Sequence, residues 1–215
     1  MSITLDWRAL GQTIGRRLYL CYTFTMIILV LGLVLFLGIH TLTTFRETRA
    51  AMIGRLGEGG YKGLYSVVSA TGLVLIVWGF ASYRSAGYIQ VWNPPVAIFH
   101  PVSLFLLWFA FVALAATYAP AGKIKAVLRH PMLVAVKAWA LSHLLVNGDL
   151  GSMLLFGGLL AWAVYDRIAL KRRGDAGAPP VDGFGVADVA VLAIGTVAYV
   201  AVFWLHESLI GVAVR

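Results

Sequence analysis

Long, uninterrupted apolar runs restrict the fold of this chain more than any other feature of its sequence. A helix needs about 20 mostly apolar residues to cross the hydrocarbon core of a bilayer. Six segments approach that length, and they run from Met26 to Leu42, Leu64 to Tyr83, Ile98 to Tyr118, Met132 to Val146, Leu150 to Ile168 and Val186 to Leu205. We therefore expect an all-α protein in contact with the lipid bilayer, folded as a polytopic transmembrane bundle of about six helices.

Charged residues are scarce and lie mainly between the apolar runs. They make up 12% of the 215 residues, whereas a typical globular domain has about a quarter. The formal net charge of +8 comes from short clusters of Lys and Arg that membrane topology explains, so we expect no nucleic-acid partner. Cys21 is the single cysteine, which excludes an internal disulfide and a metal site built from several cysteines.

The basic residues alternate from one connection to the next. Arg84 is the one basic residue after the second segment, and none follows the fourth. The first, third and fifth connections are rich in them: Arg46, Arg49, Arg55 and Lys62; Lys123, Lys125 and Arg129; Arg167, Lys171, Arg172 and Arg173. Because Lys and Arg collect on the cytoplasmic side, we predict that these three connections face the cytoplasm and that the chain ends outside.

Residues 1–25 do not fit this alternation, because Arg8, Arg16 and Arg17 would lie outside. We interpret this segment as an N-terminal extension, upstream of a membrane domain that covers residues 26–215. Translation that begins at Met26 would remove the conflict. A secretory signal is the alternative, but no small-residue cleavage pattern follows the apolar run.

The stretch RHPMLVAVKAWALSHLL, residues 129–145, combines apolar character with two histidines and a lysine. A lysine at the centre of a membrane helix costs at least about 2.5 kcal/mol, so such residues usually face the interior of a bundle. On a continuous helix, His130 and Lys137 share one face and His143 points to nearly the opposite side. Lys137 can either snorkel to the surface or face an anionic group such as a buried carboxylate.

The five histidines are the candidate metal ligands. His130 and His143 are separated by a rise of about 20 Å, whereas a metal bond to imidazole is about 2 Å long, so one helix cannot supply both ligands. Depth in the membrane would pair His40 with His130, and His143 with His100 or His206. Each imidazole also has a simpler role open to it, a hydrogen bond to a carbonyl, water or lipid headgroup. For His130, just before Pro131, a capping or loop role is an equal alternative to that of a ligand.

Several segments of the sequence resemble the NnrU family of bacterial inner-membrane proteins. They are LGLVLFLGIH (31–40), RLGEGGYKGLYS (55–66), IKAVLRHPMLVAVKAWALSHLLVNGDL (124–150), LAWAVYDR (160–167) and FWLHESLIGV (203–212). The family is named for its association with denitrification genes and is linked to nitrite and nitric oxide metabolism. The resemblance, which covers the chain from Met26 to its end, implies a multi-pass protein of the bacterial inner membrane with denitrification proteins as candidate partners.

NnrU proteins are similar to the 15-cis-zeta-carotene isomerases of plants and cyanobacteria, which carry a b-type haem with histidine axial ligands. The resemblance implies haem b as the cofactor, with His40 in GIH and His143 in ALSH as its axial ligands. His130 in RHP matches a further histidine of that group and would be a neighbouring or substitute ligand. Lys137 and Arg129 would then face the haem propionates.

Three classes of function remain open. The first is a haem-dependent cis–trans isomerase that acts on a hydrophobic polyene. The second is an accessory protein, or a redox- or gas-sensing protein, of denitrification without enzymatic activity. The third is a haem-free structural or assembly partner. One departure bears on the first class, because the isomerases have a cysteine three residues before the second ligand, where this chain has Ala140.

Overall fold

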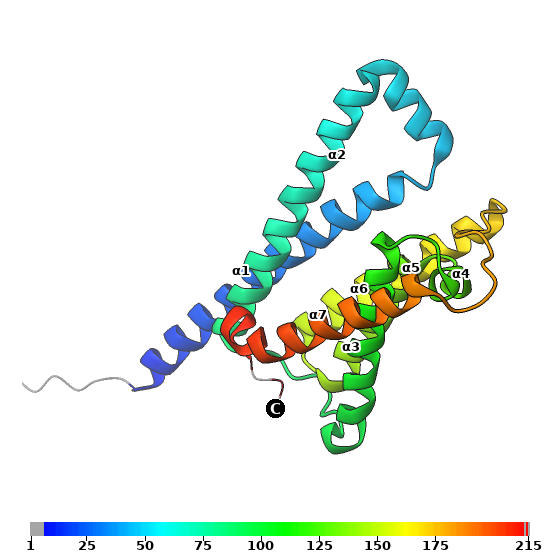
Figure 1. The fold of residues 1–215 in the computed structure, drawn as a ribbon. Coiled ribbons are helices and arrows are strands. Elements are labelled where there is room, and N and C mark those ends of the chain that lie inside the picture. Colours follow the sequence, from blue (N-terminus) through cyan, green and yellow to red (C-terminus); the bar gives the residue numbers. More distant parts are fainter. Residues whose placement is uncertain (1–6, 213, 215) are drawn as a thin grey trace, which may run out of the picture. The chain divides into compact units, whose positions relative to one another are not determined.

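The computed structural model describes residues 7–212 and residue 214, with side chains from Thr23 onward. The described residues form seven helices and no strand: α1 (Trp7–Leu42), α2 (Arg46–Ser85), α3 (Val96–Tyr118), α4 (Lys123–Leu128), α5 (Pro131–Val146), α6 (Leu150–Arg172) and α7 (Val186–Ile210) (Figure 1). The prediction of an all-α fold is confirmed. The boundary predicted at Met26 lies inside α1, and the first six residues of the predicted extension lie outside the described residues.

Five helices are long and apolar enough to cross a membrane, namely Thr23–Leu42 of α1, and α2, α3, α6 and α7. The sixth predicted segment corresponds to α5, a shorter apolar helix of 16 residues. The chain therefore has the helices of a multi-pass membrane protein. The short helix α4 was not predicted, because its six residues carry no apolar run of their own.

The second helix begins much earlier than predicted. We expected it to start at Leu64, yet α2 begins at Arg46, and its bend (Figure 1) lies at Gly57, where φ is 71° and ψ is 164°. Residues 46–56 contain good helix formers such as Arg, Glu, Ala and Leu, which favour a helix without apolar periodicity. The basic residues assigned to the first connection therefore lie on a helix, and residues 43–45 alone connect α1 to α2.

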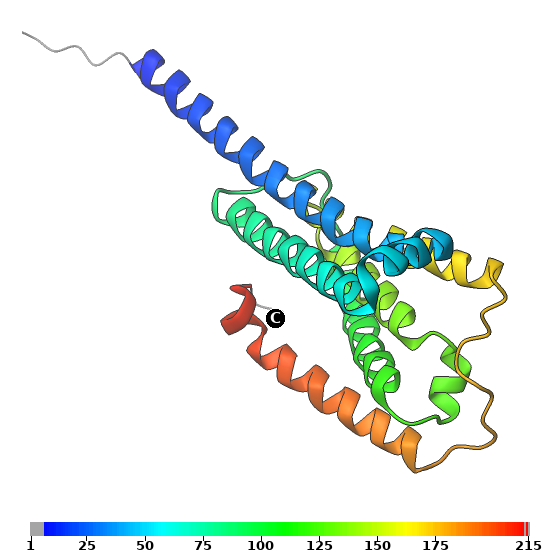
Figure 2. The same cartoon turned by 90° about the horizontal axis from the view of Figure 1, so that it is seen from above.

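The chain divides into two compact units, and α6 contributes to both. The first unit comprises Met1–Val91 and Asp149–Leu155, and the second comprises Trp92–Gly148 and Phe156–Arg215. In the first unit α1 and α2 lie side by side (Figure 2) and meet at glycines. A Cβ added at Gly79 would lie 2.5 Å from the backbone nitrogen of Leu29. Such close backbone approach is typical of small residues between membrane helices.

The buried carboxylate of Asp149 organises the connections of the first unit. It accepts a hydrogen bond from Nη1 of Arg84 at 3.1 Å and one from the backbone nitrogen of Ser152 at 3.0 Å, which caps the start of α6. The backbone nitrogen of Leu150 donates to the carbonyl of Ile89 at 2.9 Å. The second and fourth connections therefore lie together, in agreement with the predicted alternation.

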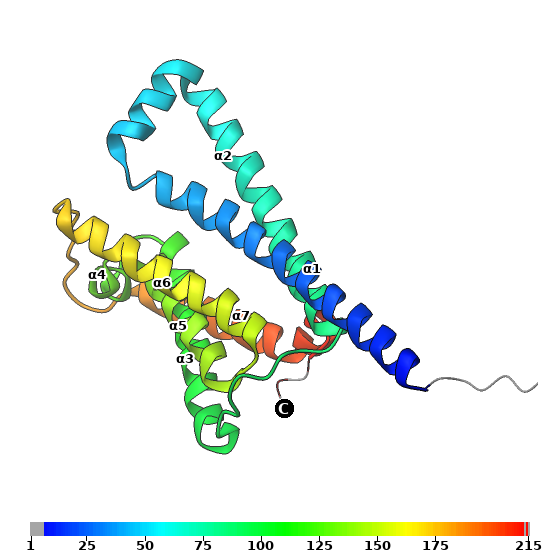
Figure 3. The same ribbon diagram turned by 180° about the vertical axis from the view of Figure 1, so that it is seen from behind.

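In the second unit α3 packs against both α5 and α7 (Figure 3). The hydroxyl groups of Ser103 and Ser142 lie 2.9 Å apart between α3 and α5, and both residues are buried. Nε1 of Trp108 donates to Oγ1 of Thr196 at 3.0 Å between α3 and α7. These hydrogen bonds satisfy polar groups that would otherwise be costly within apolar helices.

Asp188, in the first turn of α7, joins the third and fifth connections of the second unit. Its carboxylate accepts hydrogen bonds from the backbone nitrogens of Gly185 at 2.9 Å, Lys123 at 3.1 Å and Ile124 at 2.7 Å. One carboxylate thus caps the starts of α4 and α7 together. The third and fifth connections consequently meet on one side, as the alternation of basic residues requires.

Candidate functional site

His40 lies in the last turn of α1, in the first unit. Its Nδ1 atom lies 2.6 Å from the carbonyl oxygen of Phe36. A carbonyl oxygen can only accept a hydrogen bond, so Nδ1 carries a proton, and in the neutral tautomer the lone pair is on Nε2. The ring centroid of His40 lies 4.2 Å from that of Phe36 and 5.3 Å from that of Tyr65. Two aromatic rings therefore fix the plane of this imidazole.

His143 lies near the end of α5, in the second unit. Its Nδ1 atom lies 2.8 Å from the carbonyl oxygen of Trp139, which again places the lone pair on Nε2. The imidazole stacks on the ring of Phe156, with centroids 4.4 Å apart and an interplanar angle of 23°. The Trp139 ring lies 5.1 Å away. The orientation of this imidazole is thus fixed in the same manner as that of His40.

These two histidines share the arrangement that metal ligands require. A histidine that binds a metal almost always donates its other ring N–H to a carbonyl or carboxylate, which sets the tautomer and the ring orientation. His40 and His143 both donate from Nδ1 to the carbonyl four residues earlier. No group of three or more His, Cys, Asp or Glu that could hold a metal ion gathers in the described part of the chain.

His130 occupies a corner rather than a helical face. The prediction that it shares a helix face with Lys137 is wrong, because α5 begins at Pro131 and His130 is its N-cap, with φ −123° and ψ 70°. A residue before proline is disfavoured in the helical region. Lys137 is half-buried on α5, and its ammonium group forms no hydrogen bond or ion pair within the described residues.

Arg129 forms the centre of a strained turn. It has φ 59° and ψ −53°, and the backbone nitrogen of His130 donates to the carbonyl of Leu128 at 2.6 Å. These values define a γ-turn of the rare form. The carbonyl of Arg129 accepts a hydrogen bond from the backbone nitrogen of Ala178 at 2.8 Å, so the connection after α6 holds this turn in place. The side chain of Arg129 is exposed.

The same connection also reaches the imidazole of His130. Oδ1 of Asp175 lies 4.0 Å from Nε2 of His130 and accepts a hydrogen bond from the backbone nitrogen of Gly177 at 2.9 Å. His130 is therefore held between the γ-turn and the connection after α6. Its role as a neighbouring or substitute ligand stays a prediction.

Gly177 is expected to be essential for this corner. It has φ 75°, and a Cβ atom there would collide with the carbonyl oxygen of Arg129. Gly174 has φ 71° but open space at the Cβ position, so Gly174→Ala serves as a matched control. We expect the unfavourable φ to lower the free energy of unfolding of both alanine variants by about 1–2 kcal/mol. We expect Gly177→Ala alone to lose more, measured as the free energy of unfolding in detergent. Equal losses would show that Gly177 does not hold the turn.

An apolar groove of about 530 Å³ follows α1 in the first unit. It is lined by Val30, Leu33, Val34, Leu37, Gly38, Thr41, Leu42, Phe45, Thr48 and Leu154. Gly38 and Thr41 lie close to His40 in the sequence. The groove therefore offers a hydrophobic surface on the same part of α1 that carries a candidate ligand.

The remaining two histidines bond to the end of the chain. Nε2 of His100 lies 2.8 Å from the carbonyl oxygen of Val214, and Nδ1 of His206 lies 2.7 Å from that of Val212. Asp149 and Asp188 were not singled out from the sequence. Their capping positions are visible there in retrospect, because each stands three residues from its partner in the sequences DLGS and GVAD.

A protein-family model described as NnrU protein matches residues 28–214. The chain belongs to the NnrU family. The match includes His40, His130 and His143, the three histidines that the resemblance assigned to the haem. No curated protein and no solved structure matches the chain. The resemblance seen in the sequence motifs is thereby confirmed at the level of the family.

Proposed function

We propose that this NnrU protein resides in the bacterial inner membrane and binds haem b, with His40 of the first unit and His143 of the second as the candidate ligands. The single observation that supports this most is the hydrogen bond from Nδ1 to the carbonyl four residues earlier, present at both imidazoles. It fixes the orientation of each imidazole and makes Nε2 the atom that would bind a metal, as expected of a haem ligand. A neutral imidazole is also far less costly than a charged group within apolar helices.

The residues around the two imidazoles would hold the ligands in place. Phe36 and Phe156 contact the imidazole rings and restrict their rotation. In the second unit Lys137 is half-buried and Arg129 is exposed at the corner before α5, and we propose both as cationic groups for the propionates. Haem b held by these histidines would supply chemistry suited to electron transfer or to sensing a gas.

We further propose a cis–trans isomerase of a hydrophobic polyene, as in the 15-cis-zeta-carotene isomerases that the family resembles. Such a reaction rotates the groups on one C=C bond and neither adds nor removes atoms. The apolar groove along α1 supports this substrate class, because its lining contains apolar side chains and threonine methyl groups but no charged residue.

One observation favours a second function. Ala140, at the position where the isomerases have a cysteine, is completely buried and has no polar side chain. Thiolate chemistry at that position is therefore absent. This favours an accessory protein, or a redox- or gas-sensing protein, of denitrification, in which haem is bound but no polyene is converted.

The experiment that separates these functions uses the full chain purified in detergent. We expect a Soret band with the α and β bands of low-spin haem. Conversion of 15-cis-zeta-carotene by the haem-loaded protein would support the isomerase, and no conversion would support the accessory or sensing role. Protein that stays colourless with excess haem would overturn the cofactor proposal and leave a haem-free structural or assembly partner.

A further inference from the structure

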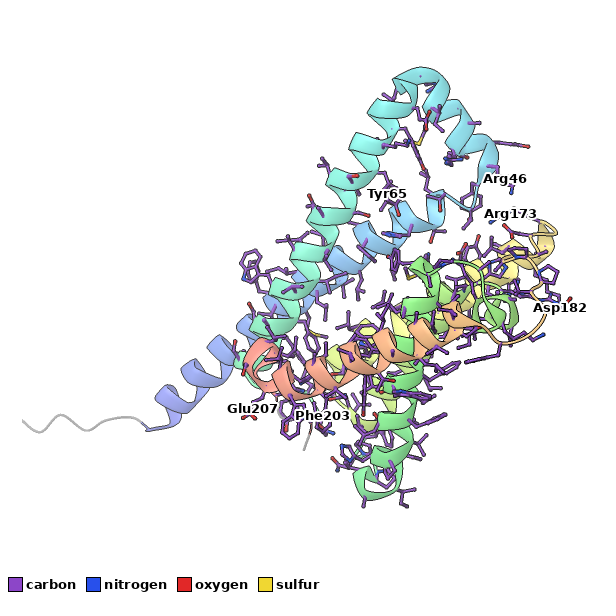
Figure 4. All side chains as sticks on the ribbon, in the orientation of Figure 1. Arg46, Tyr65, Arg173, Asp182, Phe203 and Glu207 are labelled. Atoms are coloured by element: carbon purple, nitrogen blue, oxygen red, sulfur yellow. The ribbon has the colours of Figure 1, made fainter. Side chains whose placement is uncertain are left out.

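A cluster of side chains from α2 adjoins His40 in the first unit. We call Arg49, Tyr61 and Tyr65 the Tyr61 cluster. Tyr65, labelled in Figure 4, reaches from α2 toward α1, where its ring centroid lies 5.3 Å from that of His40. The Tyr61 ring follows at 6.5 Å from Tyr65, and Cζ of Arg49 lies 5.6 Å from the centroid of the Tyr61 ring. The cluster thus extends from the candidate iron ligand to a guanidinium group.

The hydroxyl group of Tyr61 is the unusual member of this cluster. Tyr61 is 5% exposed, and its hydroxyl has no hydrogen-bond partner within the described part of the chain. A buried hydroxyl without a partner costs about 1–3 kcal/mol, and native proteins rarely leave one in that state. Because the phenol is a good donor, the missing partner is expected to be an acceptor.

Arg49 indicates that this acceptor is negatively charged. Its guanidinium group lies over the Tyr61 ring and forms no ion pair with any described carboxylate. Two acidic residues lie in this part of α2: Glu47 in its first turn, and Glu58, which is paired with Lys62 at 2.7 Å and is also attracted by the charge of Arg49. A phenol donor beside an exposed guanidinium is a suitable arrangement for a carboxylate, which accepts hydrogen bonds from both.

We infer that Tyr61 and Arg49 bind one propionate carboxylate of the haem that His40 ligates. This inference rests on the proposed function, and it adds two binding residues that the sequence did not indicate. The shared chemistry is that of a carboxylate or phosphate oxygen, and the headgroup of an anionic lipid is the competing source.

Tyr61→Phe tests the inference in the full-length protein, because it removes only the hydroxyl group. We expect the haem to transfer to excess apomyoglobin about tenfold faster than from the wild type, since a hydrogen bond to a charged group is lost. Arg49→Gln is a second variant and should accelerate release in the same direction. Tyr88→Phe is the matched control, because Tyr88 also lies under an arginine, at 5.0 Å from Cζ of Arg84, and should leave the release rate unchanged.

Haem dimethyl ester identifies the group that Tyr61 contacts. Its propionates cannot carry charge, so wild type and Tyr61→Phe should release it at equal rates. If Tyr61→Phe accelerates the release of haem and of its ester equally, the inference is overturned. It is also overturned if Tyr61→Phe loses bound anionic lipid while its rate of haem release is unchanged. If the wild type binds haem but releases it as fast as Tyr61→Phe does, this inference alone is overturned. Wild type that binds no haem would overturn the proposed function as well.

Discussion

His143→Ala and His40→Ala are each expected to abolish the low-spin absorption bands of bound haem. Removal of one axial imidazole leaves the iron five-coordinate or bound to a weaker ligand, which moves the Soret band and lowers haem affinity. Loss of a group that merely supports a metal ligand already costs about 10–100-fold in affinity, so loss of the ligand should cost at least about tenfold. Absorption spectra and haem titration of the purified variants measure both effects.

Three controls separate ligation from general damage to the fold. His100→Ala and His206→Ala remove imidazoles that bond to carbonyls near the chain end, and both should keep the wild-type spectrum. Added imidazole should restore the low-spin bands of His143→Ala, because the small ligand fits the space that the side chain leaves. His130→Ala combined with His143→Ala tests whether His130 acts as a substitute ligand. Unchanged bands in both single-ligand variants would reject the assignment.

The sequence predicted the fold where hydrophobicity decides it. The apolar runs located the helices that can cross a membrane, since their length alone identifies them. The first part of α2 was not predicted. Its residues 46–56 form a helix but are largely polar, and membrane hydropathy detects only apolar segments. The bend at Gly57 was likewise unpredicted, although only a glycine readily adopts its φ of 71°.

The candidate site was predictable only in part, because the sequence shows local contacts but not those that depend on a bend in the chain. His40 and His143 stood out because imidazoles are unusual in apolar sequence, and each hydrogen bond that orients them lies within four residues. The Tyr61 cluster did not stand out. On a continuous helix the twelve-residue step from Arg49 to Tyr61 would separate them by about 18 Å. The break at Gly57 turns the chain back on itself and brings the guanidinium group of Arg49 over the Tyr61 ring.

Contacts between distant parts of the chain were the least predictable. Arg84 and Asp149 are 65 residues apart in the sequence, as are Lys123 and Asp188. Nothing in the local sequence specifies which backbone donors a carboxylate will meet. The alternation of basic residues did predict that the second and fourth connections lie together and that the third and fifth do, because that depends on counting membrane crossings and not on contacts. The side of the first connection stays a prediction. Which side faces the cytoplasm stays a prediction from charge.

Asp188→Ala is expected to produce the largest loss of stability in the second unit. The carboxylate is 1% exposed and accepts three backbone hydrogen bonds, which would all lose their acceptor. Hydrogen bonds to a charged acceptor are among the stronger ones. We expect the thermal midpoint in detergent to fall by about 5–10 °C. Hydrogen exchange at the backbone amides of Lys123 and Ile124 should accelerate.

Asp182→Ala is the matched control, because Asp182 is exposed in the connection that precedes α7 (Figure 4). This variant should have a thermal midpoint within about 2 °C of the wild type. Asp188→Asn keeps one acceptor oxygen and should fall between the two. A midpoint for Asp188→Ala equal to that of Asp182→Ala would show that water replaces the carboxylate at no cost. In that case α4 and α7 must be held by apolar contacts such as those of Val112, Ala116 and Val191, and the carboxylate would not be the group that joins the third and fifth connections.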